Sequence, residues 1–147
     1  MTIFEALRED HDKQRTLLDI LVKTHGDSEG RNELFEKVKK ELQHHAAAEE
    51  RHFYIPLMEE DLTQDKSRHS VAEHHEIDEL IEKLETTDFS SPGWVAHAKK
   101  LHELVNHHLD EEEHGVFQLA GKALSESQKT TLATEYRQEM ERLKEEE

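Results

Sequence analysis

The chain has 147 residues, enough for one ordinary domain with its own hydrophobic core. It carries 35 acidic and 19 basic residues, and the resulting net charge of −16 repels nucleic acid and anionic lipid. Cysteine is absent, which excludes disulfides, thiol redox chemistry and iron–sulfur ligation. No apolar run reaches the roughly 20 residues of a membrane span. We therefore expect a cytoplasmic protein that binds neither nucleic acid nor membrane.

Four long amphipathic segments follow one another, and their apolar periodicity predicts helices. The first begins at a capping box formed by Thr2 and Glu5 and is expected to end at Gly26. The fourth begins where Ser91 can cap the helix and Pro92 can take its first position. The four helices are predicted at about residues 2–25, 29–59, 65–85 and 92–120.

A fifth helix is predicted at about residues 126–144, after a second capping box formed by Ser125 and Gln128. Its apolar stripe includes Tyr136, which is interpreted as a packing residue. The helix is expected to lie on the outside of the other four and to contribute no metal ligand.

The predicted fold is all-α, because no segment shows the alternating pattern of a strand. Short breaks between long helices favour antiparallel neighbours, hence an up-down-up-down four-helix bundle with an additional C-terminal helix. We expect a single domain over residues 1–147, with the bundle at about 3–120.

The thirteen histidines are the most unusual feature of the composition, because imidazole is the commonest protein ligand for transition metals. Four of them share the core-facing stripes with two glutamates, and residues four apart lie on one face of a helix. These stripes contain no Lys or Arg, and a buried carboxylate without a positive partner is costly. A bound cation resolves that cost. The predicted metal ligands are His11, His45, Glu49, His74, His108 and Glu112.

The ligand pattern occurs twice along the chain. His11 and His45 are 34 residues apart, as are His74 and His108, and a glutamate follows the second histidine of each pair by four. One offset of 63 residues therefore carries the first half of the pattern onto the second. Two helical hairpins related by a pseudo-twofold axis would each bring two imidazoles and one carboxylate to the midline. This arrangement predicts two adjacent metal ions bridged by two carboxylates.

Iron is the metal that these ligands favour. Mixed imidazole and carboxylate donors at two adjacent sites suit iron or manganese, and four imidazoles favour iron. Structural zinc usually takes cysteine or a single closed tetrahedron, so six ligands in two halves are too many for it. The predicted cofactor is therefore a pair of non-haem, carboxylate-bridged iron ions.

The segments that carry these residues resemble the four helix motifs of hemerythrin-like, cation-binding HHE domains. The matching segments are Asp10-His11, His45 to Glu50 with Phe53-Tyr54 and Pro56, Glu73 to Ile77, and His108 to Glu113. The resemblance implies that His11 and His45 bind one iron, that His74 and His108 bind the other, and that Glu49 and Glu112 bridge them. Family members carry or sense oxygen, hold or sense iron, or handle nitric oxide and peroxide.

One departure from the family concerns the third helix. Oxygen-carrying hemerythrins have a His-x-x-x-His there, whereas Asp78 stands at the second place of this chain, as a weak ligand or as a surface residue. Tyr54 is a candidate for the open place, since its equivalent under the 63-residue offset is Phe117, which lacks the hydroxyl. Regular helix geometry turns Tyr54 away from His45, but Pro56 disturbs this turn and an irregular turn would swing the phenol inward. Simple packing is the alternative for Tyr54.

The side chains next to the ligands are expected to play lesser roles. Glu50 and Glu113 are assigned mainly to the solvated face, with support of the metal centre as the alternative. The histidines beside the ligands, at positions 44, 75 and 107, are assigned to the helix flanks.

The favoured function is that of a di-iron oxidoreductase that consumes a small oxidant, with catalase-like peroxide disproportionation as the leading reaction. Anionic oxygen donors in place of an imidazole stabilise ferric iron, and a ferric pair holds oxygen poorly but can still cycle with peroxide. The alternatives are reversible binding or sensing of oxygen or nitric oxide, and an iron-holding or iron-sensing module without turnover. The sequence predicts no particular protein partner.

Overall fold

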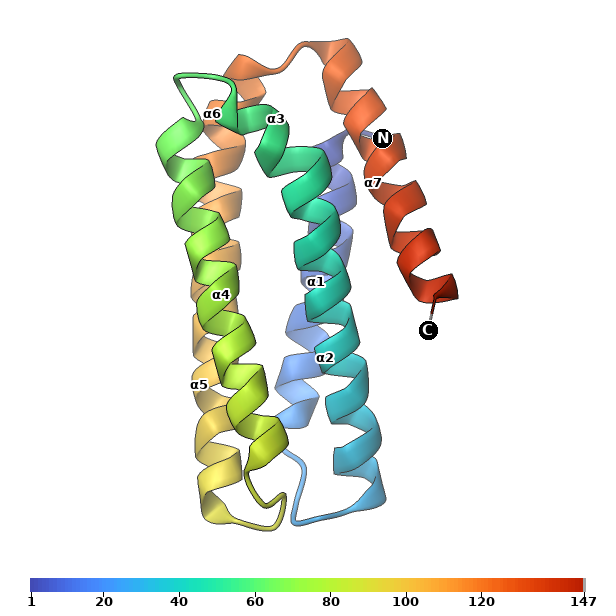
Figure 1. Ribbon diagram of the computed structural model, residues 1–147, viewed down its shortest axis with the longest axis vertical. Helices are drawn as coiled ribbons and strands as arrows, with labels where there is room; N and C mark the ends of the chain where they lie inside the picture. Colours follow the sequence, from blue (N-terminus) through green and yellow to red (C-terminus); the bar gives the residue numbers. More distant parts are fainter. Residues whose placement is uncertain (147) are drawn as a thin grey trace.

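The computed structural model describes residues 1–146, which form helices joined by short connections and contain no strand. Four long helices make up the body of the molecule, two short continuations extend the second and fourth of them, and a fifth long helix ends the chain (Figure 1). The elements are α1 (Ile3–Leu21), α2 (Glu29–Glu49), η1 (Glu50–Tyr54), α3 (Ile55–Met58), α4 (Gln64–Thr86), α5 (Pro92–Glu111), η2 (Glu112–Val116), α6 (Phe117–Ala123) and α7 (Glu126–Glu145).

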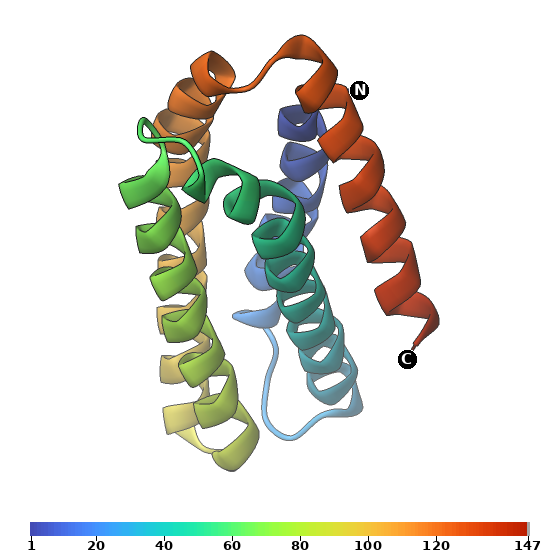
Figure 2. The same cartoon turned by 45° about the horizontal axis from the view of Figure 1, so that its top comes forward.

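Helices α1, α2, α4 and α5 run alternately in opposite directions and form a four-helix bundle (Figure 1). Helix α7 lies outside the bundle along α1 and α2, on the side away from α4 and α5 (Figure 2). The predicted all-α, up-down-up-down bundle with an additional C-terminal helix is therefore confirmed. Among the described residues, no helix is both long and apolar enough to cross a bilayer.

Local sequence signals set the helix ends. Both predicted capping boxes form, at the start of α1 and at the start of α7. Helix α1 ends at Leu21, four residues earlier than predicted, because the hydroxyl of Thr24 donates to the carbonyl of Leu21 at 2.7 Å and replaces the next helical hydrogen bond. Gly26 then takes a φ of +56°, a conformation that glycine adopts without steric cost.

Helices α2 and α5 each widen into one π-helical turn directly after a predicted glutamate ligand. These turns are η1, which follows Glu49, and η2, which begins at Glu112. Pro56 has no amide hydrogen to donate and follows η1 by two residues, so the irregular turn predicted beside this proline is present. The second half has no proline near η2, so the wider turn there has another cause. Single π turns of this kind occur frequently at functional sites.

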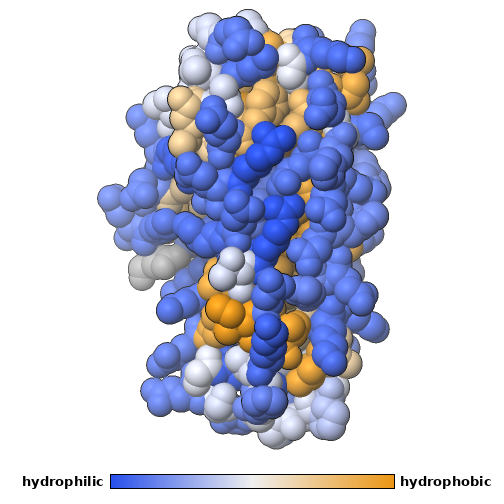
Figure 3. Space-filling model, turned by 180° about the vertical axis from the view of Figure 1, so that it is seen from behind, coloured by the Kyte–Doolittle hydropathy of each residue, from blue (hydrophilic) through white to orange (hydrophobic). Residues whose placement is uncertain are grey.

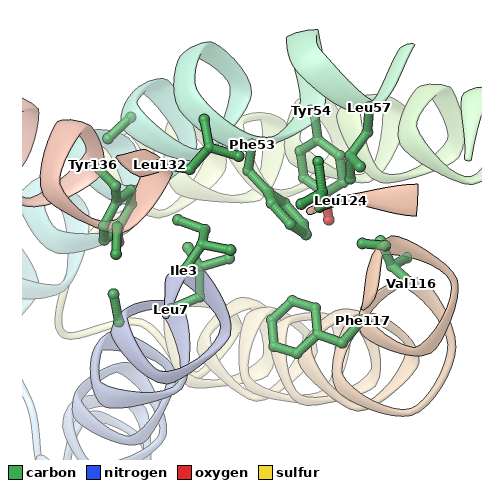
Figure 4. Packing of buried hydrophobic residues seen from close by; sticks show 14 of the residues in the cluster. Ile3, Leu7, Phe53, Tyr54, Leu57, Val116, Phe117, Leu124, Leu132 and Tyr136 are labelled. Carbon is green, nitrogen blue, oxygen red and sulfur yellow. The ribbon is translucent and has the colours of Figure 1, made fainter. Parts of the chain in front are cut away.

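The apolar core is divided into two clusters by a polar layer. The first includes Leu7, Phe53 and Phe117, and Figure 4 shows these side chains converging from three helices. The second begins at Leu18 on α1, about two turns beyond His11, and extends toward the loops that end α1 and α4. The stretch of α1 between the two clusters therefore faces a polar centre in the middle of the bundle.

The outer surface agrees with the high charge of the sequence. Figure 3 shows one face of the molecule, covered mainly by hydrophilic side chains with smaller hydrophobic areas between them. Hydrophilic residues cover most of this face, and the buried carboxylates and histidines inside the bundle therefore call for an explanation.

Candidate metal centre

The structure brings all six predicted ligands together in the polar layer. They form two groups, and within each group one ligand atom per residue lies within 4.8 Å of the others. Glu49 and Glu112 belong to both groups, and every member is buried. The first group adds His11 and His45, and the second adds His74 and His108. Two adjacent cation sites that share two carboxylates are the arrangement predicted from the repeat.

Each histidine turns Nε2 toward the shared glutamates. Glu49 contacts ring nitrogens from both hairpins, and so does Glu112, which matches a bridging position for each carboxylate. The Nε2-to-carboxylate distances are 2.9 Å from His11 to Glu112, 3.1 Å from His74 to Glu49, 3.5 Å from His45 to Glu49 and 3.5 Å from His108 to Glu112.

A second polar group holds the opposite nitrogen, Nδ1, of every ligand histidine. Three of these outer partners are carboxylates and one is a phenol. Such partners fix the tautomer and the orientation of a metal-binding imidazole. The pairs are His11 with Glu113 at 2.6 Å, His45 with Tyr136 at 2.6 Å, His74 with Glu50 at 3.0 Å and His108 with Glu73 at 2.8 Å.

These outer contacts decide between two assignments made from the sequence. Glu50 and Glu113 were assigned mainly to the solvated face, but each accepts a hydrogen bond from a predicted metal ligand. Glu73 plays the same part for His108, and the sequence identified it only as part of a motif. His75 and His107, which were assigned to the helix flanks, are exposed, in agreement with that assignment.

The inner atoms fit a metal cation better than they fit one another. A carboxylate accepts but cannot donate, so Nδ1 carries a proton wherever it meets one, and in the neutral imidazole Nε2 keeps its lone pair for a metal ion. Within residues 1–146, Nε2 of His45, Nε2 of His108 and both oxygens of Glu49 are buried and have no hydrogen-bond partner. Lone pairs that face one another in a buried site require a cation between them.

The pKa values of His74 and Glu49 are both shifted in the direction that favours positive charge on the imidazole and negative charge on the carboxylate. Burial alone would lower the pKa of His74, but contact with Glu49 and Glu50 raises it to about 10. Burial would raise the pKa of Glu49, but His45, His11 and His74 together hold it well below its usual value. Glu49 therefore stays ionised and favours a proton on His74. A metal ion would bind in competition with that proton.

Tyr136 interrupts the pseudo-twofold symmetry of the outer contacts. Glu50 and Glu113 are equivalent under the 63-residue offset, whereas the equivalent of Glu73 is Asp10. Asp10 does not meet His45 directly, because the Tyr136 hydroxyl lies between them. It accepts from Nδ1 of His45 at 2.6 Å and donates to Asp10 at 2.5 Å.

The interpretation of Tyr136 as only a packing residue was therefore wrong, because its hydroxyl contacts a predicted ligand. Helix α7 lies outside the bundle as predicted, but it supplies the hydroxyl that holds His45. The repeat contains no counterpart of α7, so the internal symmetry of the sequence gave no signal for this contact.

Tyr54 lies on the inner side of the π turn η1 and is fully buried. Its hydroxyl donates to Glu112, and its ring lies 6.1 Å from that of His74. Phe117, its equivalent, stacks on His11 at 6.0 Å without a polar atom. Burial, followed by Glu112 and Glu49, raises the pKa of the Tyr54 phenol well above its usual value, so the phenol keeps its proton unless a cation approaches. The irregular turn thus directs the phenol inward, with its hydroxyl on the shared carboxylate of Glu112 and its ring beside His74.

Asp78 does not join either ligand group, and its side chain is exposed. It lines a small cavity of about 10 Å³ beside His45, His74 and His108. Gln14, a residue that the sequence did not single out, lines the same cavity. It follows His11 by three residues on the same face of α1, which was the available signal.

The sequence of this chain matches a known protein family. Residues 2–120 match the family model described as hemerythrin HHE cation binding domain. A crystal structure of a hemerythrin HHE cation-binding domain-containing protein from Mycobacterium kansasii superposes with a TM-score of 0.87, covering 97% of this chain and 87% of that one. The two sequences are 22% identical, so this likeness speaks for the fold alone.

A curated relative is longer than this chain. A DNA nickase from Nostoc sp. is 28% identical over 137 residues. The match covers 93% of this chain but 38% of that protein, so the chain spans well under half the length of this relative.

Replacing Tyr136 by Phe should weaken metal binding. Tyr136→Phe keeps the ring and leaves Nδ1 of His45 without an acceptor. We expect the free energy of unfolding to fall by about 1–3 kcal/mol. We expect the affinity for ferrous iron to fall about 10- to 100-fold, as measured by competition with a chelator.

Leu132→Ala is the matched control, because Leu132 is buried on the same helix and belongs to the apolar cluster. It should lower stability and leave iron affinity within about threefold of the unmodified chain. Equal iron affinity in Tyr136→Phe and the unmodified chain would show that α7 has no role in the site.

Proposed function

The chain belongs to the hemerythrin HHE cation-binding domain family, and from this we propose that it is a di-iron protein that consumes a small oxidant, by disproportionation of hydrogen peroxide. One observation carries the proposal: two buried ligand groups, each with two imidazoles, share Glu49 and Glu112. Imidazole and carboxylate donors of this mixture suit iron. Bound there, an iron pair would supply the reversible electron transfer that disproportionation needs.

The donors around the second group favour oxidant consumption over oxygen carriage. Tyr54 directs a hydroxyl to Glu112 on the side of His74, and a carboxylate, Asp78, stands near the cavity where oxygen carriers have a histidine. Oxygen donors of negative charge stabilise the ferric state, in which reversible oxygen binding is disfavoured. The residues therefore support a centre that rests oxidised and reacts with peroxide.

The chain also supplies places to hold a proton. Disproportionation converts two molecules of hydrogen peroxide into one of dioxygen and two of water, so two protons and two electrons leave one peroxide and reach the other. The hydroxyl of Tyr54 donates a hydrogen bond to the carboxylate of Glu112. Glu112 belongs to both ligand groups, so this pair could hold a proton beside the bound oxidant.

The relative from Nostoc sp. is a DNA nickase, but we do not extend nicking to this chain. A net charge of −16 opposes approach to the phosphate backbone, since that interaction depends on basic residues. The proposed binding partner is a small molecule, and we propose no binding to nucleic acid or to a membrane. Reversible binding of oxygen or nitric oxide, and iron storage without turnover, are the functions against which the proposal is tested.

Oxygen evolution tests the proposed reaction directly. Purified chain loaded with iron should release one dioxygen for every two hydrogen peroxide molecules consumed, as followed with an oxygen electrode and a peroxide assay. Metal-free chain and an equal concentration of free ferric iron are the controls, and both should be much slower. Loss of peroxide without oxygen release would contradict disproportionation. A spectrum that changes reversibly on adding and removing oxygen would point to carriage.

Tyr54→Phe tests the role of the phenol. If the phenolate binds ferric iron, it should produce a visible charge-transfer band that imidazole and carboxylate do not produce. The substitution keeps the ring packing and removes the oxygen, so iron content should stay near two per chain while the band disappears and the rate with peroxide changes. Phe117→Tyr in the opposite half is the matched comparison, and it should leave the band of Tyr54 in place. An unchanged spectrum and rate in Tyr54→Phe would make Tyr54 a packing residue.

A further inference from the structure

A small cavity adjoins the ligand groups on the side away from Tyr54. Its walls include Leu42, Ile77 and Val105, which belong to the second apolar cluster, whereas Tyr54 belongs to the first. The imidazoles of His45, His74 and His108 form another part of its lining, so the cavity meets residues of both ligand groups. At about 10 Å³ it has room for the centre of about one water-sized molecule.

Gln14 contributes a carboxamide side chain to the lining of this cavity. Its side chain is only 2% exposed, and within residues 1–146 its Nε2 is buried and has no hydrogen-bond partner. Nearly all buried amide groups in proteins are hydrogen-bonded, because leaving one without a partner costs free energy. The unpaired Nε2 of Gln14 is therefore available to donate a hydrogen bond to a molecule that binds in this cavity.

Only the first half of the 63-residue repeat carries this hydrogen-bond donor. Under the 63-residue offset the equivalent of Gln14 is Ile77, which lines the same cavity with an apolar side chain. Glutamine is not needed to fill this volume, because the pseudo-equivalent place is filled by isoleucine. The other polar residue of the lining that is not a histidine is Asp78, whose exposed carboxylate accepts hydrogen bonds but offers no donor in its ionised form.

We propose that this cavity is the binding subsite for a small ligand with a strong hydrogen-bond acceptor, and that the Gln14 carboxamide recognises it by donating a hydrogen bond. The chemical class is that of hydroperoxide and of small anions such as azide. Neutral diatomic molecules accept hydrogen bonds poorly, so Gln14 favours peroxide over dioxygen. Gln14 is therefore a specificity-determining residue, and this inference rests on the proposed di-iron function.

Azide titration of the ferric, iron-loaded chain tests the inference without relying on turnover. Azide is followed by its visible absorption band, and iron per chain is measured for every variant. Gln14→Met keeps the length of the side chain and removes the donor. Its dissociation constant for azide should rise about 10- to 100-fold, because hydrogen bonds to charged groups are the strong ones. Iron content should remain that of the unmodified chain.

Ile77→Met is the matched control, because it places the same side chain at the pseudo-equivalent position. Its azide affinity should stay within about threefold of the unmodified chain. Nitric oxide affinity of the ferrous chain should change little in Gln14→Met, since nitric oxide is a weak acceptor.

Thermal unfolding of the metal-free chain separates recognition from a structural role. Removing an unpaired buried amide should leave the melting temperature of Gln14→Met equal or higher, whereas a structural glutamine would make it lower. Unchanged azide affinity in iron-replete Gln14→Met would overturn the inference and leave the di-iron function standing. An unmodified chain that binds no iron would overturn both.

Discussion

Two carboxylates and four imidazoles lie in the middle of a narrow bundle, and this burial is the constraint on which the rest of the structure depends. Both oxygens of Glu49 are buried without a hydrogen-bond partner within residues 1–146. Apolar clusters on either side keep water away from them, which makes the electrostatic cost larger. The neighbouring imidazoles hold the pKa of Glu49 well below its usual value despite its burial, so this carboxylate keeps its negative charge and is available to a metal cation. Stability and metal binding are therefore two aspects of one arrangement.

The repeated hairpins supply the symmetric part of the site, and its differences lie in side chains that the repeat does not share. Tyr54 meets the second group where Phe117 meets the first, and Gln14 faces the cavity opposite Ile77. On the outer side, Tyr136 of α7 lies between His45 and Asp10, whereas in the other half His108 contacts Glu73, the equivalent of Asp10, directly. An iron pair held here would therefore have two inequivalent members.

The fold and the inner ligands could be predicted because both depend on periodicity. The 3.6-residue period placed the helices, and the 63-residue offset of His11, His45 and Glu49 identified their counterparts. The outer partners could not be found in this way. Tyr136 reaches His45 from 91 residues away along the chain, and only the packing of α7 brings them together. Tyr54 turns inward because it lies in the π turn η1. The equivalent π turn η2 forms without a nearby proline, so proline is not a reliable sequence signal for such a turn.

The central claim is that the buried histidines and glutamates hold a pair of irons, and thermal unfolding with counted metal tests it most directly. Metal-free chain should bind two irons and then unfold at a clearly higher temperature, because the cations replace protons among buried acceptors. Glu49→Ala and Glu112→Ala should each lose both irons, since each carboxylate belongs to both groups. One zinc per chain, or equal melting temperatures with and without two bound irons, would contradict this account.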